Sequence, residues 1–284
     1  MMPVGIVMLG CEKMTVGTEE DIEEQGNVVL HFSAFQTDMQ TRATQPVSSV
    51  FSKLAIMMFD SEGNKVFSKT KTQSNDEDNF GTVVLSTGEG TYTLIAVGHS
   101  GYNTPSIALD KVSFTTKDGL RNTDTFYYYG TITVSNDVEH HDLVMIRATA
   151  MFRLQLSDEA LPAGVTKLHF KTTGGSADFN PQDGLGCTNS TQEEDRAVTS
   201  NSRVFEVFTF PKSVSGSKVK IIVTALDAND NVLKTRTFID VPVKANYITT
   251  YTGNFFDGTE TNVTQSGLGF TADPEWKSTN EYDF

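Results

Sequence analysis

The sequence predicts an all-β protein built from two β-sandwich domains in tandem. From Asn27 onward the chain consists of short segments rich in Val, Ile, Thr, Phe and Tyr, separated by Gly, Asn, Asp and Pro. Few stretches place apolar residues at helical spacing, and strands that recur every ~8 to 12 residues are typical of sandwiches. At 284 residues the chain exceeds the usual size of one domain, so two domains are expected.

The first eleven residues read as the end of a lipoprotein signal peptide. In MMPVGIVMLGC an apolar stretch and the small Gly10 precede Cys11. A signal peptidase would cut after Gly10 and leave the Cys11 thiol for a lipid. The stretch is short and lacks basic residues, which a start site further upstream would explain. The alternative is an ordinary apolar N-terminus with a buried thiol.

Residues 12–27 (EKMTVGTEEDIEEQGN) are predicted to form an exposed tether. They hold six acidic residues and few apolar ones, so they offer little surface to a packed core. No apolar run in the chain reaches the ~18 residues that span a bilayer. A lipid on Cys11 would therefore be the membrane attachment.

Residues 28–142 are predicted to form the first sandwich. Its opening segment, VVLHFSAF, alternates and places Leu30, Phe32 and Ala34 on one face. The next segments are an apolar strand and an amphipathic strand joined by a turn that starts at Asp60. TYTLIAVG is predicted as a central strand because it is almost entirely apolar.

Residues 143–284 are predicted to form the second sandwich, opened by the run from Leu143 to Leu156. The boundary is placed near the polar stretch DVEHHD. An internal echo supports two similar domains, because LAIMMFDSEGNKVFSKT resembles IIVTALDANDNVLKTRT at a constant offset, with Asp60 aligned on Asp227. Such hairpins are common, so the echo is supporting and not decisive.

A metal site is not expected. His140 and His141 are adjacent and flanked by acids, but neighbouring side chains on a strand point to opposite faces, so a solvated linker is the preferred interpretation. Asp227 opens a stretch with alternate oxygen ligands. That stretch lacks the glycine and the final glutamate of a calcium loop, so a hairpin turn is the better explanation.

No catalytic constellation is recognised either, so no cofactor and no enzyme activity are expected. The chain has no nucleophile elbow, no Walker loop and no dinucleotide fingerprint opening a helix. Cys187 lies in a polar loop without a nearby base. The net charge of −14 opposes binding to nucleic acid.

The order of these segments resembles the fimbrillins of Bacteroidales, which are type V pilins and their anchor relatives. The resemblance rests on Cys11, the acidic tether, VVLHFSAF, then QTRATQ, GEGTYTLIAVG, RATAMFRL and NYITTYTGNFF. It implies two transthyretin-like sandwiches, export as a lipoprotein to the outer membrane and assembly into fimbriae with other fimbrial subunits.

The resemblance also implies a maturation step. In shaft subunits a trypsin-like protease cuts after an arginine that follows the first strand, which removes that strand and opens a groove. The matching bond here joins Arg42 to Ala43. A subunit cut in this way should take a replacement strand from a neighbour. An ordinary solvated loop with one arginine is the alternative.

The candidate donor strand lies near residues 266–276, where Leu268, Phe270 and Ala272 share one face. The alternative is that this tail completes its own sheet. An anchor or minor subunit would keep its first strand and its lipid, and the sequence does not separate that role from a shaft role.

Two functions are therefore weighed. The first is a cell-surface structural subunit or anchor of fimbriae. The second is a surface lipoprotein that binds a glycan or host protein through exposed aromatic residues such as Tyr127, Tyr128 and Tyr129. Packing within a strand is the simpler explanation for that run, because alternate members would face the core.

Overall fold

The structure is a computed structural model that describes residues 26–35, 44–116, 121–257, 262–263, 269–271 and 278–283. The predicted all-β fold is confirmed. The described residues form strands and two short 3₁₀ helices, η1 (Val47–Ser49) and η2 (Glu77–Asn79), with no α-helix. Within these ranges no helix has the length and apolar character to cross a membrane.

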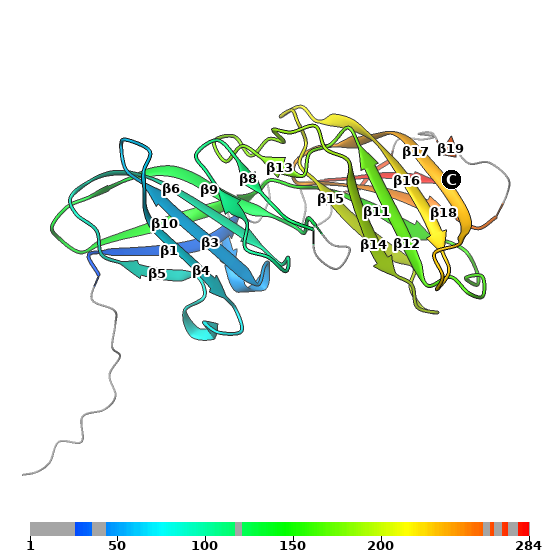
Figure 1. Cartoon of the computed structure of the whole chain (residues 1–284), viewed down its shortest axis with the longest axis horizontal. Helices are drawn as coiled ribbons and strands as arrows, with labels where there is room; N and C mark the ends of the chain where they lie inside the picture. The colour runs from blue at the N-terminus through cyan, green and yellow to red at the C-terminus, as the bar shows by residue number, and fades with distance from the viewer. Residues whose placement is uncertain are drawn as a thin grey trace, which may run out of the picture.

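The first half of the chain forms a sheet that folds over on itself (Figure 1). One part has the order β5–β1–β10, with the short β2 also beside β1, and the other has the order β9–β6–β3–β4. The strands are β1 (Val28–Phe35), β2 (Thr44–Pro46), β3 (Lys53–Phe59), β4 (Lys65–Thr72), β5 (Thr82–Leu85), β6 (Gly90–His99), β9 (Phe126–Val134) and β10 (Glu139–Arg147).

The two parts enclose one apolar core. Inward side chains of β1, β5 and β10 meet those of β3, β6 and β9, with Phe51 and Phe80 from the connections. The segment TYTLIAVG is indeed central, because β6 pairs with β3 on one edge and β9 on the other. Burial of these alternating side chains is the main stabilising term for such a sandwich.

The second half forms two facing sheets, with the orders β15–β11–β18–β21–β20 and β14–β12–β16–β17–β19. Their inner faces share a second apolar core, centred on Phe152, Phe238 and Tyr251. The strands are β11 (Ala150–Leu156), β12 (Lys167–Thr173), β14 (Gln192–Ala197), β15 (Val204–Thr209), β16 (Ser217–Leu226), β17 (Val232–Val243), β18 (Tyr247–Gly253), β19 (Asn262–Val263), β20 (Gly269–Thr271) and β21 (Ser278–Asp283).

The two halves share a strand order. The first strand of each half lies between two strands from later in that half, as β5–β1–β10 and β15–β11–β18. The facing sheets correspond in the same way, as β4–β3–β6–β9 and β14–β12–β16–β17. This order is what two sandwiches of one type would give, while the domain boundaries themselves stay predictions.

The internal echo relates strands that do not correspond in this order. LAIMMFDSEGNKVFSKT forms the hairpin β3–β4, whereas IIVTALDANDNVLKTRT forms β16–β17. Both hairpins use the same turn. The Asp60 carboxylate accepts the Asn64 N–H at 2.8 Å, and the Asp227 carboxylate accepts the Asn231 N–H at 2.9 Å. The echo therefore reports shared turn chemistry and not equivalent strands.

The run from Leu143 to Leu156 is two strands and not one. Leu143 and Met145 lie on β10 in the first core, and β11 begins at Ala150 in the second. The predicted boundary after residue 142 thus falls inside β10. The chain passes between the halves at Ala148 and Thr149, where the N–H of Thr125 donates to the Thr149 hydroxyl at 3.2 Å.

A small third sheet joins the halves. β7 (Ser106–Ile107) and β8 (Val112–Ser113) lie in the long connection between β6 and β9, and β8 pairs with β13 (Asp178–Phe179) from the connection between β12 and β14. Figure 1 shows β8 and β13 side by side at the middle of the molecule. Apolar residues of both halves, including Phe114, Phe179 and Phe210, pack around this sheet.

Candidate functional site

The first strand, β1, is the candidate functional site. It is the first described strand of the chain, and it lies between β10 on one edge and β5 and β2 on the other. It runs parallel to β10 from the Val28–Glu139 pair to the Ala34–Met145 pair. Its other edge is covered by β5 near its start and by β2 near its end, both antiparallel. β1 is therefore hydrogen-bonded on both edges.

The inward side chains of β1 are fully packed. Val28, Leu30 and Ala34 are completely buried and Phe32 is 6% exposed. The predicted shared face of Leu30, Phe32 and Ala34 is thereby confirmed. The three larger side chains contribute roughly 1.5 to 3 kcal/mol each and Ala34 about 0.8 kcal/mol, so β1 carries on the order of 5 to 10 kcal/mol of burial. That amount is comparable to the whole stability of a domain.

Polar contacts fix the start and the middle of β1. The Asn27 side chain donates to the Thr87 carbonyl at 2.9 Å and accepts the Thr87 N–H at 3.0 Å. The Phe32 N–H donates to the Gly81 carbonyl at 2.8 Å, at the point where β5 begins. A Cβ at Gly26 would lie 2.4 Å from the Leu85 carbonyl oxygen, so the backbone before β1 passes close to β5.

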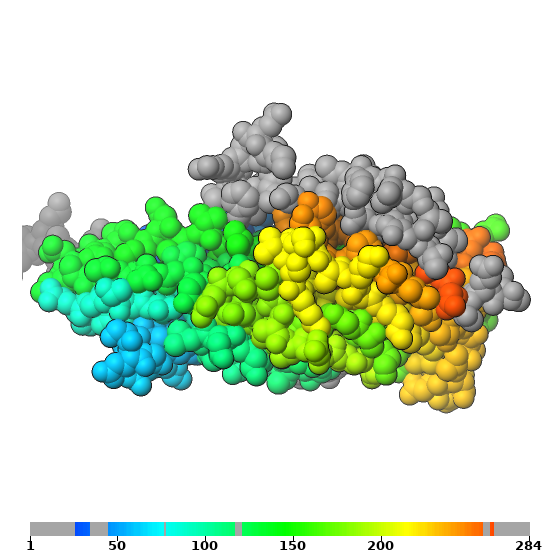
Figure 2. All heavy atoms as spheres, turned by 90° about the horizontal axis from the view of Figure 1, so that it is seen from above, coloured from blue at the N-terminus to red at the C-terminus, as the bar shows by residue number. Residues whose placement is uncertain are grey.

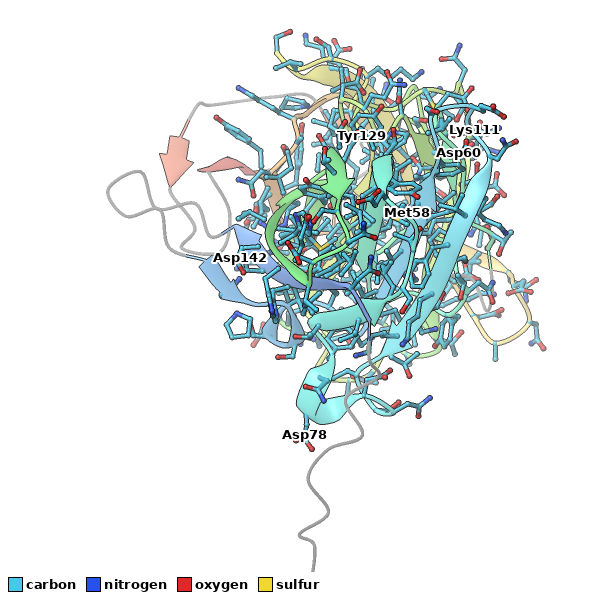
Figure 3. The ribbon with its side chains drawn as sticks, turned by 90° about the vertical axis from the view of Figure 1, so that its left-hand side faces the viewer. Met58, Asp60, Asp78, Lys111, Tyr129 and Asp142 are labelled. Carbon is cyan, nitrogen blue, oxygen red and sulfur yellow. The ribbon has the colours of Figure 1, made fainter. Side chains whose placement is uncertain are left out.

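The predicted solvated linker at His140 and His141 is wrong. Both residues lie on β10 and pair with β1, because Val29 is opposite His140 and Leu30 is opposite His141. On the outer face the rings of His31 and His140 meet, with Nδ1 of His140 3.4 Å from Nε2 of His31. Asp142, labelled in Figure 3, lies exposed on the same outer face. The outward side chains of β10 are polar, which is why the segment read as a linker. Its inward side chains include the buried apolar residues Leu143 and Met145.

Most of the sequence-predicted site residues lie outside the described residues. These are Cys11, Arg42, Ala43, Leu268 and Ala272. The Arg42–Ala43 bond nevertheless falls between two described strands, since β1 ends at Phe35 and β2 begins at Thr44. A cut there would separate β1 from β2 and from the rest of the chain.

Phe270 lies on β20, within the candidate donor segment. β20 pairs antiparallel with β21, and β21 runs parallel to β18 along the edge of the second half. Residues 269–271 thus lie in a sheet of their own chain, while the donor strand itself stays a prediction. Strand donation from this segment would require β20 to leave β21.

The tyrosine run is mostly packed. Tyr127 lies in the cluster between the halves against Phe179, and burial raises its pKa to about 12. Tyr128 is half-buried against the first core, whereas Tyr129 is exposed. One ring of the three is therefore available for binding at the surface (Figure 3).

The other candidate groups do not form a reactive site. Partial burial and the nearby Asp178 raise the pKa of the Cys187 thiol, which disfavours the reactive thiolate. His99 is buried, and burial together with Lys53 lowers its pKa to about 4. Among the described residues no three His, Cys, Asp or Glu side chains come together in a way that could hold a metal ion.

Comparisons with solved structures find similar proteins. A candidate polysaccharide-binding protein from Bacteroides thetaiotaomicron aligns with a TM-score of 0.52 at 12% identity, over 75% of this chain and 79% of that chain. The fimbrial anchor protein Mfa2 from Porphyromonas gingivalis aligns with a TM-score of 0.40 at 14% identity, over 73% of this chain and 80% of that chain. The first likeness shows a shared fold.

Sequence comparison is more decisive. None of the curated proteins compared with the chain matches it. The family described as fimbrillin-A associated anchor proteins Mfa1 and Mfa2 matches residues 18–281, which is nearly the whole chain and includes both halves of the fold. The resemblance to the fimbrillins is thereby confirmed, and the chain belongs to the family of fimbrillin-A associated anchor proteins.

Proposed function

We propose that this member of the anchor family, a fimbrial or adhesin-like surface protein, is a structural subunit or anchor of fimbriae assembled by β-strand donation. The family consists of fimbrial anchor proteins and not of enzymes. Export as a lipoprotein would attach Cys11 to the outer membrane, and the acidic residues 12–27 would separate the lipid from the folded part. Its partners are other fimbrial subunits.

The observation that carries this proposal is the placement of β1. A terminal strand with four buried side chains, paired on both edges, can be replaced by another extended segment with the same alternation. The replacing strand would recover the backbone hydrogen bonds to β10 and the apolar contacts of Leu30 and Phe32. Without a replacement, the first core would be open to water.

The state of β1 separates a shaft role from an anchor role. Cleavage between Arg42 and Ala43 would release β1 and leave β2 attached to the body, so that the groove between β5 and β10 could accept a strand. A chain that keeps β1 and a lipid on Cys11 would be closed at this groove. It would then act as a tether or a terminating subunit.

The test is intact mass and N-terminal sequencing of the protein from its native cells, for the natural chain and for Arg42→Ala. A shaft subunit should begin at Ala43, and the variant should stay full length and fail to enter fibres. Arg42→Lys is the matched control, because a trypsin-like protease still cuts it. Fibres of normal length from an uncut Arg42→Ala protein would rule out the cleavage mechanism.

A further inference from the structure

A pocket in the second half of the chain has the chemistry of a binding site. It lies where the connection from β15 to β16 meets the connection from β17 to β18, and it has a volume of about 340 Å³. Its walls include Ser215, Ser217, Lys218, Val243, Lys244 and Tyr247. In Figure 2 the yellow segment around residue 215 lies on the surface beside the orange segment around residue 245.

The pocket is basic in a chain that carries a net charge of −14. The stretch PKSVSGSKVKIIVTAL, residues 211–226, contains three lysines and no acid. Of these three, Lys218 lines the pocket, and Lys244 lines it from the facing connection. An oxygen of the Asp240 carboxylate lies 4.0 Å from the Lys218 Nζ, and both side chains are well exposed. A pair at that distance leaves most of the positive potential in place.

The walls are held in place before any ligand arrives. Gly216 has a φ of +98°, and a Cβ there would lie 3.1 Å from the Val243 carbonyl oxygen, so the loop approaches β17 closely. On the other wall Asn246 has a φ of +64°. Its N–H donates to the Thr149 carbonyl at 2.8 Å and its side chain accepts from Arg147 at 2.7 Å. A fixed cavity loses little entropy on binding.

The groups that line the pocket are complementary to a sugar that carries a carboxylate. The half-buried Tyr247 supplies an aromatic ring, and the Lys244 ammonium lies 4.8 Å from the centre of that ring. Ser215 and Ser217 supply hydroxyls, and Lys218 supplies a cation. The volume is at the low end of small-molecule sites, which suits one ring-sized residue and not an extended peptide.

We propose that this pocket binds a carboxylated sugar residue, of the uronic-acid class, within an acidic polysaccharide. The carboxylate would contact Lys218 and Lys244, the sugar hydroxyls would bond to the serines, and the apolar face of the ring would pack on Tyr247 and Val243. The site goes beyond the structural role proposed above, since it is independent of β1 and of strand donation.

The test is an NMR titration of the full chain with methyl glucuronide, and with methyl glucoside as the neutral match. Saturable shifts at residues 213–218 and 242–247 are expected for the glucuronide alone, weakening as salt is raised because the contacts are charged. The double variant Lys218→Met, Lys244→Met should bind on the order of tenfold more weakly. Lys218 is exposed and Lys244 is half-buried, and a thermal unfolding scan checks that the variant is folded.

Lys65→Met, which removes an exposed lysine from β4 in the first half, is the control and should bind like the natural chain. Equal binding of glucuronide and glucoside would overturn the proposal, as would an equal loss in the Lys65→Met control. A peptide of residues 12–27 that binds the pocket while the glucuronide does not would also overturn it, and would assign the site to an acidic protein segment. None of these outcomes depends on fibre formation.

Discussion

The strands β1 and β11 occupy the same place in the two halves, yet they are held differently. Each runs parallel to a later strand of its own half, β1 to β10 and β11 to β18. The opposite edge of β11 is covered by one strand, β15, which pairs from Ala150 to Gln155. The same edge of β1 is shared by β5 and β2, which pair with its beginning and its end.

The two strands also differ in how the chain continues from them. β11 follows Ala148 and Thr149 directly out of β10, at a point where Arg147 bonds to Asp124 at 2.9 Å. β1 has no described strand before it, and it connects to β2 through residues 36–43. The comparison teaches that two buried strands at the same place in the sheet order can differ in whether the fold permits their exchange. One cut would free β1, whereas freeing β11 would need two.

The largest effect is expected from freeing β1. A site-specific protease sequence placed at Arg42, followed by cutting and removal of the strand under mild denaturant, should cost the first half roughly 5 to 10 kcal/mol of burial. Hydrogen exchange read by mass spectrometry should show lost protection in β3, β6, β9 and β10. Protection in β12, β16 and β18 should be retained.

The matched control places the same protease sequence at the exposed turn between β14 and β15, next to Asn201. That cut frees no terminal strand, so protection in the second half should persist. Equal losses of hydrogen-exchange protection after both cuts would contradict the distinction drawn between β1 and β11.

Acid should weaken the first half before the second. Burial lowers the His99 pKa to about 4, so the folded state stays neutral while the unfolded state takes up a proton below its ordinary pKa of 6.5. Stability is therefore full above pH ~6.5 and falls as the pH drops toward 4, by about 3 kcal/mol in total. His99→Asn keeps an acceptor for the Gly101 N–H and should flatten this dependence.

Glu194, in the second half, should make stability depend on pH with the opposite sign to His99. Burial raises its pKa, so the folded state holds its proton more readily than the unfolded state does. Its contribution is full below the ordinary pKa and is lost as the pH rises through the raised value. Urea unfolding at pH 5 and pH 7 checks both signs. Phe114→Leu keeps the imidazole but loosens the packing that buries it, so it should weaken the pH dependence without abolishing it.

A smaller effect should separate the two shared turns. The turn of β3–β4 uses Gly63 at a φ of +84°, whereas that of β16–β17 uses Asp230 at +64°. Gly63→Asp should cost about 1 kcal/mol, because a side chain in this conformation is strained and its Cβ would lie 3.3 Å from Leu109. Urea unfolding measures the change, and a stabilised Gly63→Asp chain would contradict this account of the turn.

The smallest effect should come from the carboxylates that close these turns. Backbone N–H groups and asparagine side chains hold the pKa of Asp60 and of Asp227 below the ordinary value, with the Asn64 N–H the main cause for Asp60 and the Asn231 side chain for Asp227. Asp60→Ala and Asp227→Ala should each lower the thermal midpoint slightly and by similar amounts. A large loss for one variant alone would show that the two turns differ in more than the exchange of Gly63 for Asp230.

Sequence reasoning predicted the strands that alternate or are wholly apolar, such as β1 and β6. It missed β14, whose segment QEEDRA reads as polar surface. The inward residues of β14 are Gln192 and Glu194, both buried, and they bond to Thr209 and Arg196. Hydrophobic patterning cannot find a strand whose buried positions are polar and satisfied by hydrogen bonds.

The site was predicted in part for the same reason. The inward face of β1 could be read from alternation, because it depends on neighbouring residues alone. Its partner β10 was taken for a linker, because its outer residues, which include His140 and Asp142, hide the alternation of Leu143 and Met145. The lysines of the pocket gave a usable signal, a basic stretch without acids in an acidic chain, but only the fold brings Tyr247 beside them.

The parallel pairing of β1 and β10 has a mechanical consequence for a chain held from its N-terminus. The beginning of β1 lies beside the beginning of β10, so the N-terminal end of β1 and the C-terminal end of β10 are at opposite ends of the pair. A pull on the tether against the second half would load the whole ladder in shear, with its hydrogen bonds strained together and not peeled one at a time. The parallel direction of β1 and β10 would thus set how well the fold resists a pulling force on the N-terminal segment.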